Sequence, residues 1–553
     1  MNKMPSFTPS LVLSALALAC AAQAQTELAP DQGSCANCAP SAAPAPQTMP
    51  AAPAAPPASF RLEGVRLSGV QALDAAELDA LTAPYLHRAV TLADLEALAQ
   101  QIGEKYRARG YFLAQAVVPV QTVQNGIVEI SVIEGRLGEI TVNVAPDAPI
   151  TEAWVRVFLA PLQSGQALSG PEYERVMLLL SDLPGVRVSS QLEEGAQTGT
   201  TDLTVDVTAA RRWSFSLDAD NQGVKETGRY RAGGSMRWAS PFGIGDNLDA
   251  RLMLSNTADL TLGRISYEAP LGARGLRAGL GFARINYQLG GEYADLDPYS
   301  IADIFDVSLS YPLIRSRRQN LFLRLGAEMK ELKDDYRALG WVAKKRTTGL
   351  NLGWTWELRD TLLSGGYWAS SGAWYHGRLN LRDADSANND HGPNGLHTAG
   401  SFDKLTFQVS RLQRIAEHHA LYLSLGGQWA RKNLDPSEKL SLGGAQAVRA
   451  YPSGEVLVDK GLIGTLEWRW SLNQSWTPFL FYDAATGWQS KKPLPTTEDN
   501  RRSLRGAGIG LQWARAGNFS INATLAWRNG TPRASTDGGG HNPRLFLQLQ
   551  KVF

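Results

Sequence analysis

The pattern of apolar and polar residues divides the 553-residue chain into segments of different character. An apolar run, Leu11–Ala22, lies near the start, and the stretch from residue 39 to residue 59 is dominated by Pro and Ala. From residue 60 to residue 208 the apolar residues recur at both helix-like and strand-like spacings. Beyond Arg211 they alternate with polar residues, which indicates β-strands. We therefore expect a targeting segment, a linker, an α+β region and an all-β region, in that order.

Residues 60–136 are predicted to form the order strand, helix, helix, strand, strand. Thr91 should cap the second helix, because its hydroxyl can accept hydrogen bonds from first-turn amides and Asp94 favours the positive end of the helix. One apolar face follows at helical spacing, and Gly110 ends the helix. The residues of that face are Leu92, Leu95, Leu98, Ile102 and Tyr106. The predicted strands are Phe60–Val70, Tyr111–Val118 and Ile127–Ile133, and the predicted first helix is Asp74–Leu81. Asn125-Gly126 lies in the connection between the last two strands.

The same order of elements is predicted a second time between residues 137 and 208. The predicted elements are the strand Leu137–Val144, the helices Glu152–Ala160 and Pro171–Ser181, and the strands Val186–Leu192 and Leu203–Val207. Two units of one topology indicate an internal repeat, although their sequences hardly match. From periodicity alone, any small α+β module is an alternative.

From residue 211 to residue 553 the chain contains about sixteen alternating segments of about ten residues, the number and length of strands in a sizeable outer-membrane barrel. One of them alternates Leu462, Gly464, Leu466, Trp468 and Trp470 with Ile463, Thr465, Glu467, Arg469 and Ser471. Backbone groups in lipid need hydrogen-bond partners, so such a sheet must close, with an apolar outside and a polar inside. A soluble β-sandwich or propeller is the alternative.

Charged and aromatic residues fit the barrel. Five charges fall on the inward side of the alternation, where only a water-filled lumen makes them tolerable: Arg324, Glu328, Glu357, Glu467 and Arg469. Of the 15 Trp residues, all but Trp154 follow residue 210, and several stand at strand ends, as in interfacial aromatic girdles.

The N-terminus has the features of a secretory signal peptide. Lys3 precedes the apolar run, and Ala22-Gln23-Ala24 is a small-residue cleavage pattern, so residues 1–24 should be removed. Cys20 raises a lipoprotein as an alternative. Residues 25–59 then form a Pro/Ala-rich linker that is too poor in apolar bulk for a core. Cys35 and Cys38 fit a small local disulfide better than a redox or metal site. The linker predicts either no plug helix ahead of the α+β units or a very short one.

Charge and motifs exclude several classes of function. With 54 Lys+Arg against 53 Asp+Glu, the chain lacks the basic excess of a nucleic-acid binder. It contains no phosphate-binding loop, no His-Glu-x-x-His and no Gly-x-Ser-x-Gly, so we expect no enzyme, cofactor or metal. The segment Asp383–Asp390 lacks the spacing of a calcium loop and is predicted to be a solvated surface loop. His418 and His419 should point to opposite faces of a strand.

One long connection stands out. Residues 431–459 follow the eleventh predicted strand and contain Val448-Arg449-Ala450-Tyr451. Two strands later, Phe479-Leu480-Phe481-Tyr482-Asp483 places Phe481 and Asp483 on one face and Leu480 and Tyr482 on the lipid face. A guanidinium in a narrow lumen would pair best with a fixed carboxylate, in a bidentate geometry. An exposed Arg449 without a partner is the alternative.

These features together resemble the transporters of two-partner secretion, the haemolysin-activator family of the POTRA–barrel superfamily. POTRA denotes the polypeptide-transport-associated domain, which the predicted repeat resembles through its element order, Gly110-Tyr111 and Val132-Ile133-Glu134-Gly135. The family's loop motif, Val-Arg-Gly-Tyr/Phe, maps onto Val448, Arg449, Ala450 and Tyr451, and its strand motif maps onto Phe481 and Asp483. Two positions depart from the family: Ala450 replaces Gly, and Asp483 is followed by Ala484.

The resemblance implies a fold: two POTRA domains, residues 60–136 and 137–208, precede a transmembrane barrel of about 16 antiparallel strands in residues 211–553. It also implies that the loop 431–459 folds into the lumen, with Arg449 near Asp483. The terminal Phe553, with Leu545, Leu547 and Leu549 on the same side, resembles the signal by which barrels reach their assembly machinery.

The function implied is a pore in the outer membrane of a Gram-negative bacterium. Its periplasmic POTRA domains would capture an unfolded exoprotein through the N-terminal secretion domain of that partner, and the barrel would pass it to the cell surface without ATP. Besides the exoprotein, the implied partners are outer-membrane lipid and the barrel-assembly machinery, and no nucleic acid. The alternatives are a barrel-assembly insertase of the same superfamily and a passive diffusion porin.

Overall fold

The computed structural model describes residues 59–256, 259–495, 497, 499–515, 518–530, 534 and 541–553. The predicted signal peptide, the Pro/Ala-rich linker, the cysteine pair and any plug helix lie outside these residues. The described part of the chain divides into an α/β part and a barrel part, each with its own internal contacts.

The first α/β unit is built around a three-stranded sheet in the order β2-β5-β4, with β2 parallel to β5 and β4 antiparallel to it. A separate pair, β1 and β3, lies ahead of the long helix α3. The bounds are β1 Phe60–Arg61, β2 Gly64–Ser68, α2 Ala75–Thr82, η1 Ala83–Tyr85, β3 Ala89–Val90, α3 Leu92–Ala108, β4 Gln115–Val117 and β5 Ile127–Ile133.

The start of α3 has the predicted cap. The Thr91 side chain accepts from the backbone N–H of Asp94 at 3.3 Å, and the Asp94 carboxylate accepts from the backbone N–H of Thr91 at 2.8 Å. This reciprocal pair satisfies two of the free amide groups at the helix start. Leu95, Leu98, Ile102 and Tyr106 are buried as predicted. The prediction for Leu92 is wrong, because this residue is 58% exposed. Leu92 is the first residue of α3.

Two predicted strands of this unit are wrong in length. The strand predicted at Phe60–Val70 is interrupted, because Leu62 leaves the sheet to exchange backbone hydrogen bonds with Arg88 and His87. The strand predicted at Tyr111–Val118 is reduced to β4, because Gly110, at a φ of +98°, turns the chain and Tyr111 still donates to the carbonyl of Tyr106 in α3.

The second α/β unit repeats the strand order. Its sheet runs β6-β8-β7, with the first and last strands of the unit parallel and adjacent, as β2 and β5 are in the first unit. The bounds are β6 Arg136–Val144, α4 Glu152–Leu159, α5 Gly170–Ser181, β7 Val186–Glu194 and β8 Thr200–Ala209.

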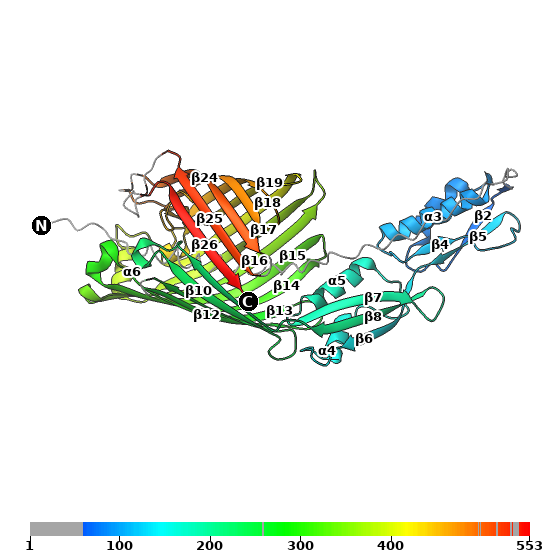
Figure 1. Ribbon diagram of the computed structural model, residues 1–553, viewed down its shortest axis with the longest axis horizontal. Coiled ribbons are helices and arrows are strands. Elements are labelled where there is room, and N and C mark those ends of the chain that lie inside the picture. Colours follow the sequence, from blue (N-terminus) through cyan, green and yellow to red (C-terminus); the bar gives the residue numbers. More distant parts are fainter. Residues whose placement is uncertain are drawn as a thin grey trace. The chain divides into compact units, whose positions relative to one another are not determined.

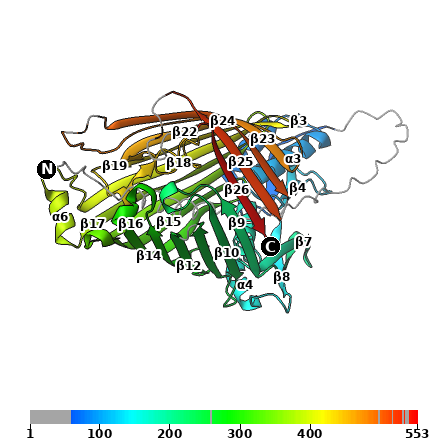
Figure 2. The ribbon, with the colours of Figure 1, turned by 60° about the vertical axis from the view of Figure 1, so that its left-hand side comes forward.

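The remainder of the chain forms one closed barrel of 16 antiparallel strands, in which β26 pairs with β9. Figures 1 and 2 show the strands lying side by side and tilted along a curved wall. The strands are β9 Trp213–Asp220, β10 Arg231–Ala239, β11 Asn247–Ser255, β12 Leu260–Pro270, β13 Arg277–Gln288, β14 Pro298–Arg315, β15 Gln319–Tyr336, β16 Trp341–Asp360, β17 Gly366–Leu381, β18 Gly400–Ala416, β19 His419–Ala430, β22 Lys460–Trp470, β23 Trp476–Trp488, β24 Arg501–Arg515, β25 Phe519–Arg528 and β26 Arg544–Val552. The predicted strand number is confirmed.

Burial alternates along the strands as a lipid-facing barrel requires. On β22, Leu466 and Trp468 are 46% and 45% exposed, whereas Glu467 between them is 5% exposed. Apolar side chains therefore face outward and polar ones face the lumen, as in outer-membrane barrels. Among the described residues, no helix is long and apolar enough to cross a membrane.

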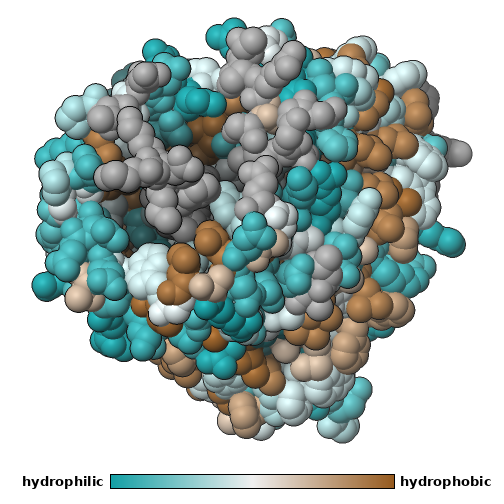
Figure 3. All heavy atoms as spheres, turned by 90° about the vertical axis from the view of Figure 1, so that its left-hand side faces the viewer, coloured by the Kyte–Doolittle hydropathy of each residue, from teal (hydrophilic) through white to brown (hydrophobic). Residues whose placement is uncertain are grey.

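The two ends of the barrel differ in the length of their connections. At one end the strands are joined by short turns, such as residues 417–418 and 471–475. At the other end the connections are longer, such as residues 382–399 and 431–459. In outer-membrane barrels the short turns are periplasmic and the long loops extracellular. Figure 3 views the side on which α6 (Ala384–His391) lies in Figure 1, and polar residues cover much of that surface while apolar residues gather along one edge.

The helix α6 corrects a sequence prediction. The segment Asp383–Asp390, expected to be a surface loop, is mostly helical, because the Asp383 side chain accepts from the backbone N–H of Ser386 and caps it. Asp390 is bound to Thr398 and to the backbone of Ala399, and is not free to hold an ion. Within the described ranges, no group of three or more His, Cys, Asp or Glu residues could hold a metal ion.

Candidate functional site

The connection between β19 and β22, residues 431–459, carries its own structure. It contains the short helix η5 (Pro436–Glu438) and a small hairpin of β20 (Leu440–Ser441) and β21 (Leu457–Val458). We call the residues that this hairpin closes, Leu442–Val456, the loop tip. Backbone bonds from Leu442 to Val456 and from Val448 to Leu442 fold the tip on itself. Most of the tip is buried against inward-facing residues of the barrel wall.

Arg449 of the tip is held by Asp483 of β23. The Nε and Nη2 atoms of Arg449 donate to the two carboxylate oxygens of Asp483, both at 2.8 Å, and its backbone N–H donates to Oδ2 at 3.1 Å. The side chains are 9% and 0% exposed. A bidentate ion pair removed from water is strongly directional, so this contact fixes both the side chain and the backbone of the tip.

A second carboxylate shares the same guanidinium. Glu467 of β22 accepts from Nη1 of Arg449 at 2.7 Å, and its other oxygen accepts from Nη2 of Arg469 at 2.7 Å. Thr465 adds a hydroxyl bond to Asp483 at 3.0 Å. The four charges cancel: two guanidinium groups face two carboxylates. Buried charges are tolerated when each has a partner, and this cluster provides one for every member.

The wall beneath Arg449 is aromatic. Its guanidinium carbon lies 3.6 Å above the ring centre of Phe481 and 5.9 Å from that of Phe479. These rings fill space that β24 leaves open: a Cβ atom placed on Gly508 would lie 2.4 Å from the Phe481 ring, and one on Gly510 would lie 2.0 Å from the Phe479 ring. Glycines at every second position of β24 thus let both rings lie close against this strand.

The other motif residues complete an apolar contact. Val448 and Tyr451 are fully buried, and Ala450 is 1% exposed. They pack with Phe479, Phe481, Ala485, Leu504 and Ala526 of strands β23 to β25. The tip is therefore held in two ways, by a charge cluster and by apolar burial on the same part of the wall.

Ala450, the departure from the family's Gly, fits its surroundings. Its backbone is outside the left-handed region, so no glycine is required there for conformational reasons. The methyl group occupies the space above Gly506, where a second Cβ would come within 2.5 Å of it. The other departure, Ala484, is an ordinary residue of β23, which continues to Trp488.

The last residue, Phe553, lies next to the first strand of the barrel. Its side chain is 49% exposed, its backbone N–H donates to the carbonyl of Phe215 at 2.8 Å, and its carbonyl accepts from Arg211. Leu545 and Leu547 are also exposed on β26, on the outward side.

Sequence reasoning missed two parts of this site. Glu467 is recognisable from the sequence only as an inward charge, although it lies on the same side of β22 as Thr465, which is opposite Asp483. The glycines of β24 are the other part: in the sequence, Gly506, Gly508 and Gly510 alternate with Ala507 and Ile509. A strand with glycine at every second position indicates that something packs closely on that face.

Comparison with known proteins gives the same picture over most of the chain. Residues 199–513, more than half of the chain, match the family described as haemolysin secretion/activation protein ShlB/FhaC/HecB, and residues 60–135 match the POTRA domain of ShlB type. The heme/hemopexin transporter protein HuxB of Haemophilus influenzae (strain 86-028NP) is 28% identical over 486 residues, which are 86% of this chain and 84% of HuxB.

Two further relatives are transporters named CdiB. The outer membrane transporter CdiB of Escherichia coli O6:K15:H31 (strain 536 / UPEC) is 26% identical over 439 residues, 75% of this chain and 69% of that protein. The solved structure of CdiB from Escherichia coli superposes with a TM-score of 0.74 at 19% identity and covers 100% of both chains, which shows the same fold. The chain therefore belongs to the haemolysin secretion/activation family of two-partner secretion transporters, whose barrel lies in the bacterial outer membrane and whose POTRA domains lie in the periplasm.

Proposed function

We propose that this protein exports an unfolded partner polypeptide through its barrel, with the loop tip restricting the lumen until Arg449 leaves Asp483. The observation that carries the proposal is that two kinds of contact hold the tip: the buried ion pair of Arg449 with Asp483 and apolar packing on the same part of the wall. A loop that only lined a static pore would need neither a buried bidentate ion pair nor an apolar seat. A hold that depends on a few contacts can be released as one unit.

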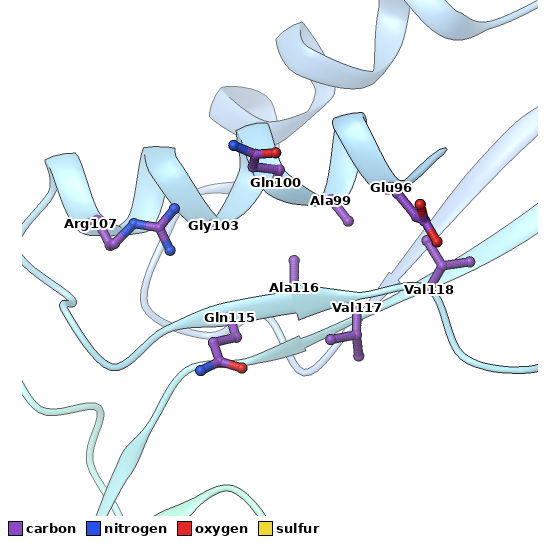
Figure 4. Close-up of a pocket in the computed structure, with 9 residues that line it drawn as sticks. All are labelled: Glu96, Ala99, Gln100, Gly103, Arg107, Gln115, Ala116, Val117 and Val118. Carbon is purple, nitrogen blue, oxygen red and sulfur yellow. The ribbon is translucent and has the colours of Figure 1, made fainter. Parts of the chain in front are cut away.

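Capture of the partner is proposed to begin at the first α/β unit. In its sheet, β4 pairs with β5 on one side, and the other edge of β4 lies along α3. Figure 4 shows the groove between them, with Ala99 of α3 and Ala116 of β4 pointing toward each other and Arg107 and Glu96 at opposite ends. The groove has a volume of about 430 Å³.

Small residues make this groove suited to a peptide backbone. Gly103 and Ala99 on α3 and Ala116 on β4 leave room for a strand to approach the edge. Main-chain hydrogen bonds to a strand edge supply affinity that hardly depends on side chains, which suits a carrier of unfolded chains. The two charged residues at the ends would select the direction or register of the strand.

Passage through the lumen is proposed to follow the wall away from the tip. The strands β10 to β14 carry matched ion pairs there, including Arg237 with Asp249 at 2.8 Å and Arg264 with Asp306 at 3.0 Å. A wall of paired charges presents no large field of one sign, so polypeptide segments of either charge can pass it.

The proposed energy source is folding of the exported chain outside the cell, without ATP. The partners we infer are a secreted protein with an N-terminal secretion domain, the lipid of the outer membrane and, during biogenesis, the barrel-assembly machinery. The name of HuxB contains heme/hemopexin and the name of CdiB contains no cargo, so we assign this chain the class of cargo, an unfolded exoprotein, and no particular member of that class. We propose no enzymatic activity, since the members of the family are transporters.

The test is a secretion assay combined with single-channel recording in planar bilayers. Arg449→Ala and Asp483→Ala should reduce the partner in the culture medium and change the open-state conductance together, since they break the same contact. Asp303→Ala is a matched control, because it breaks a bidentate ion pair with Arg284 on the outward side of β14, which does not touch the tip. A protein whose variants keep full solute flux and leave every extracellular protein unchanged would be a diffusion porin instead.

A further inference from the structure

The loop 431–459 is attached to the barrel at a second place, on strands other than those that hold Arg449. Glu438, in η5, is 1% exposed and lies between two lysines of separate strands. Its carboxylate accepts from Lys330 of β15 at 3.0 Å and from Lys404 of β18 at 2.7 Å. Lys404 also donates to the backbone carbonyl of Glu438 at 3.2 Å, so both main chain and side chain are held.

A neighbouring acidic residue makes the same kind of contact. Asp435, just before η5, accepts from Nζ of Lys345 of β16 at 3.0 and 3.1 Å, and both side chains are 9% exposed. Asp435 also accepts from the backbone N–H of Ser437 at 3.0 Å, which caps η5. The segment Asp435–Lys439, which we call the loop base, is thus bound to β15, β16, β18 and, through Gln428, β19. The tip is bound to β22, β23, β24 and β25 and, through Ser453, to the backbone of Gln222.

The two ends of the loop are also tied together beneath the tip. Lys439 in the base lies 3.3 Å from the carboxylate of Asp459, the last residue of the loop, which is 0% exposed. The other contacts of Asp459 are the backbone N–H groups of Leu434 at 3.1 Å and Lys491 at 2.7 Å. A movement of the tip therefore does not pull directly on the base.

The charges of the base depend on each other. Lys330 and Lys404 are both largely buried, with side chains 13% and 15% exposed, and both lie near the ring of Tyr375 at 5.9 and 5.5 Å. Lys330 has a second carboxylate partner in Glu328 at 3.0 Å. Without the carboxylate of Glu438, the ammonium groups of Lys330 and Lys404 would remain buried near the same ring. Among the residues that the structure describes, Glu328 would then be the one carboxylate left beside them, as the partner of Lys330. Removing one member of a buried charge group costs more than the pair is worth, because the remaining charge stays buried.

We propose that Glu438 is a positioning residue for transport: it anchors the loop base so that release of Arg449 lets only the tip move. The inference rests on the proposed function but concerns a separate movement. The moving part is then Leu442–Val456, and the hairpin β20–β21 is the hinge between a fixed base and a mobile tip.

The proposal is tested by two spin-label distances in the full-length protein in nanodiscs, with Cys35 and Cys38 changed to Ser. A label at Gln446, the exposed residue of the tip, reports the tip, and a label at Pro436 reports the base. Each is measured against a label at Glu417, in a short turn at the opposite end of the barrel. Arg449→Ala should broaden the tip distance and leave the base distance unchanged. Glu438→Gln should broaden the base distance, with the displaced population rising on the order of tenfold or more.

Further variants separate positioning from general stability. Glu438→Asp keeps the charge and should restore a narrow base distance, whereas Asp306→Asn, a lumenal acid away from the loop, should leave both distances unchanged. Migration of the unheated barrel on a denaturing gel establishes that each variant is folded.

Two outcomes would overturn the proposal. One is an equal broadening of both distances in Arg449→Ala, which means that the loop moves as one body. The other is an unchanged base distance in Glu438→Gln. Neither outcome depends on export, so a protein that secretes nothing but shows the expected distances would refute the proposed function and leave the anchor standing.

Discussion

Arg449 combines three kinds of contact in one side chain: a bidentate bond to Asp483, a third N–H to Glu467, and a ring face beneath the guanidinium. A planar fork can satisfy two carboxylates at once, and a lysine ammonium cannot reach both in the same geometry. The site is therefore specific for arginine as well as for positive charge.

We expect Arg449→Lys to be almost as defective as Arg449→Ala in secretion and in single-channel behaviour. Breaking a buried ion pair of this kind costs about 3–5 kcal/mol, because Asp483 stays buried without its partner. Lysine would recover only part of that. Arg469→Lys serves as the comparison, since Arg469 is more exposed and contacts only one side of Glu467. A fully active Arg449→Lys protein would show that charge alone holds the tip.

Replacing a glycine of β24 that lies against an aromatic ring should destabilise the barrel. Gly510→Ala would place a methyl group within 2.0 Å of the Phe479 ring, so the wall must shift, which typically costs about 1–3 kcal/mol. Gly464→Ala on β22 is the matched control, because its nearest neighbour would lie 3.9 Å away. The temperature at which the folded barrel band disappears on a denaturing gel should fall for Gly510→Ala and stay unchanged for Gly464→Ala.

The helices and strands could be predicted from the sequence where the apolar residues recur at one regular spacing. The alternation of β23 alone places Phe479, Phe481 and Asp483 on one side, and all three are buried in the structure, whereas Leu480 and Tyr482 are 50% and 39% exposed. The cap at Thr91 could be predicted because it needs only the four residues from Thr91 to Asp94. The length of β4 could not, because it depends on where the chain leaves α3 through Gly110.

Contacts between distant segments were the least predictable part. Lys330, Lys345 and Lys404 belong to three different strands, and nothing in their local sequences indicates that they surround η5. The same holds for Glu467: its inward position is evident from the alternation of β22, but its partner, Arg449, lies in a loop. Pairings across a lumen depend on strand register, which a single sequence does not provide.

The capping box of α3 gives a pH prediction. The backbone N–H of Thr91, and then its hydroxyl, lower the pKa of Asp94 below its ordinary value. A carboxyl with a lowered pKa in the folded state adds stability above its unfolded pKa of about 3.9 and loses it as the pH falls through the folded value. The first turn of α3 should therefore lose protection from hydrogen exchange, beyond the change in intrinsic rate, when the pH falls below about 4.

This effect can be measured by mass spectrometry on the peptides that cover Thr91 to Ala108 of the intact protein. In Asp94→Asn the additional loss at low pH should disappear, since the amide does not titrate. Thr91→Ala should weaken the protection at every pH by about 1 kcal/mol. Identical pH profiles in the native protein and in Asp94→Asn would contradict the assignment.

On the scale of the whole molecule, the barrel separates two solvents by the direction in which each side chain points. Leu425 on β19 is 48% exposed on the outward side, between Trp429 near one end of the strand and Leu421, opposite Trp468, near the other. Its neighbour Ser424 faces the lumen and lies 3.4 Å from Gln408. One position along the strand thus changes the surroundings from lipid to water.

We expect Leu425→Arg to destabilise the barrel by about 2–4 kcal/mol, the cost of a cation near the middle of the bilayer. Ser424→Arg, in the adjacent position, should cost far less because its charge reaches the lumen. Urea unfolding in liposomes, followed by tryptophan fluorescence, measures both. Equal losses for the two variants would mean that this part of the wall does not face lipid.

The closure of the sheet has a consequence for how the molecule is made. Only five residue pairs join β26 to β9, from Gln548 with Asp220 to Val552 with Ser216, and the side-chain bond that continues this seam joins Asn221 to Leu547 across 326 residues of sequence. Contacts of such high sequence separation carry a large entropic cost and cannot nucleate folding. Every other pair of neighbouring strands can form locally as a hairpin. The sheet must therefore remain open until its final strand has been synthesised, and pairing of β26 with β9 completes the folding of the barrel.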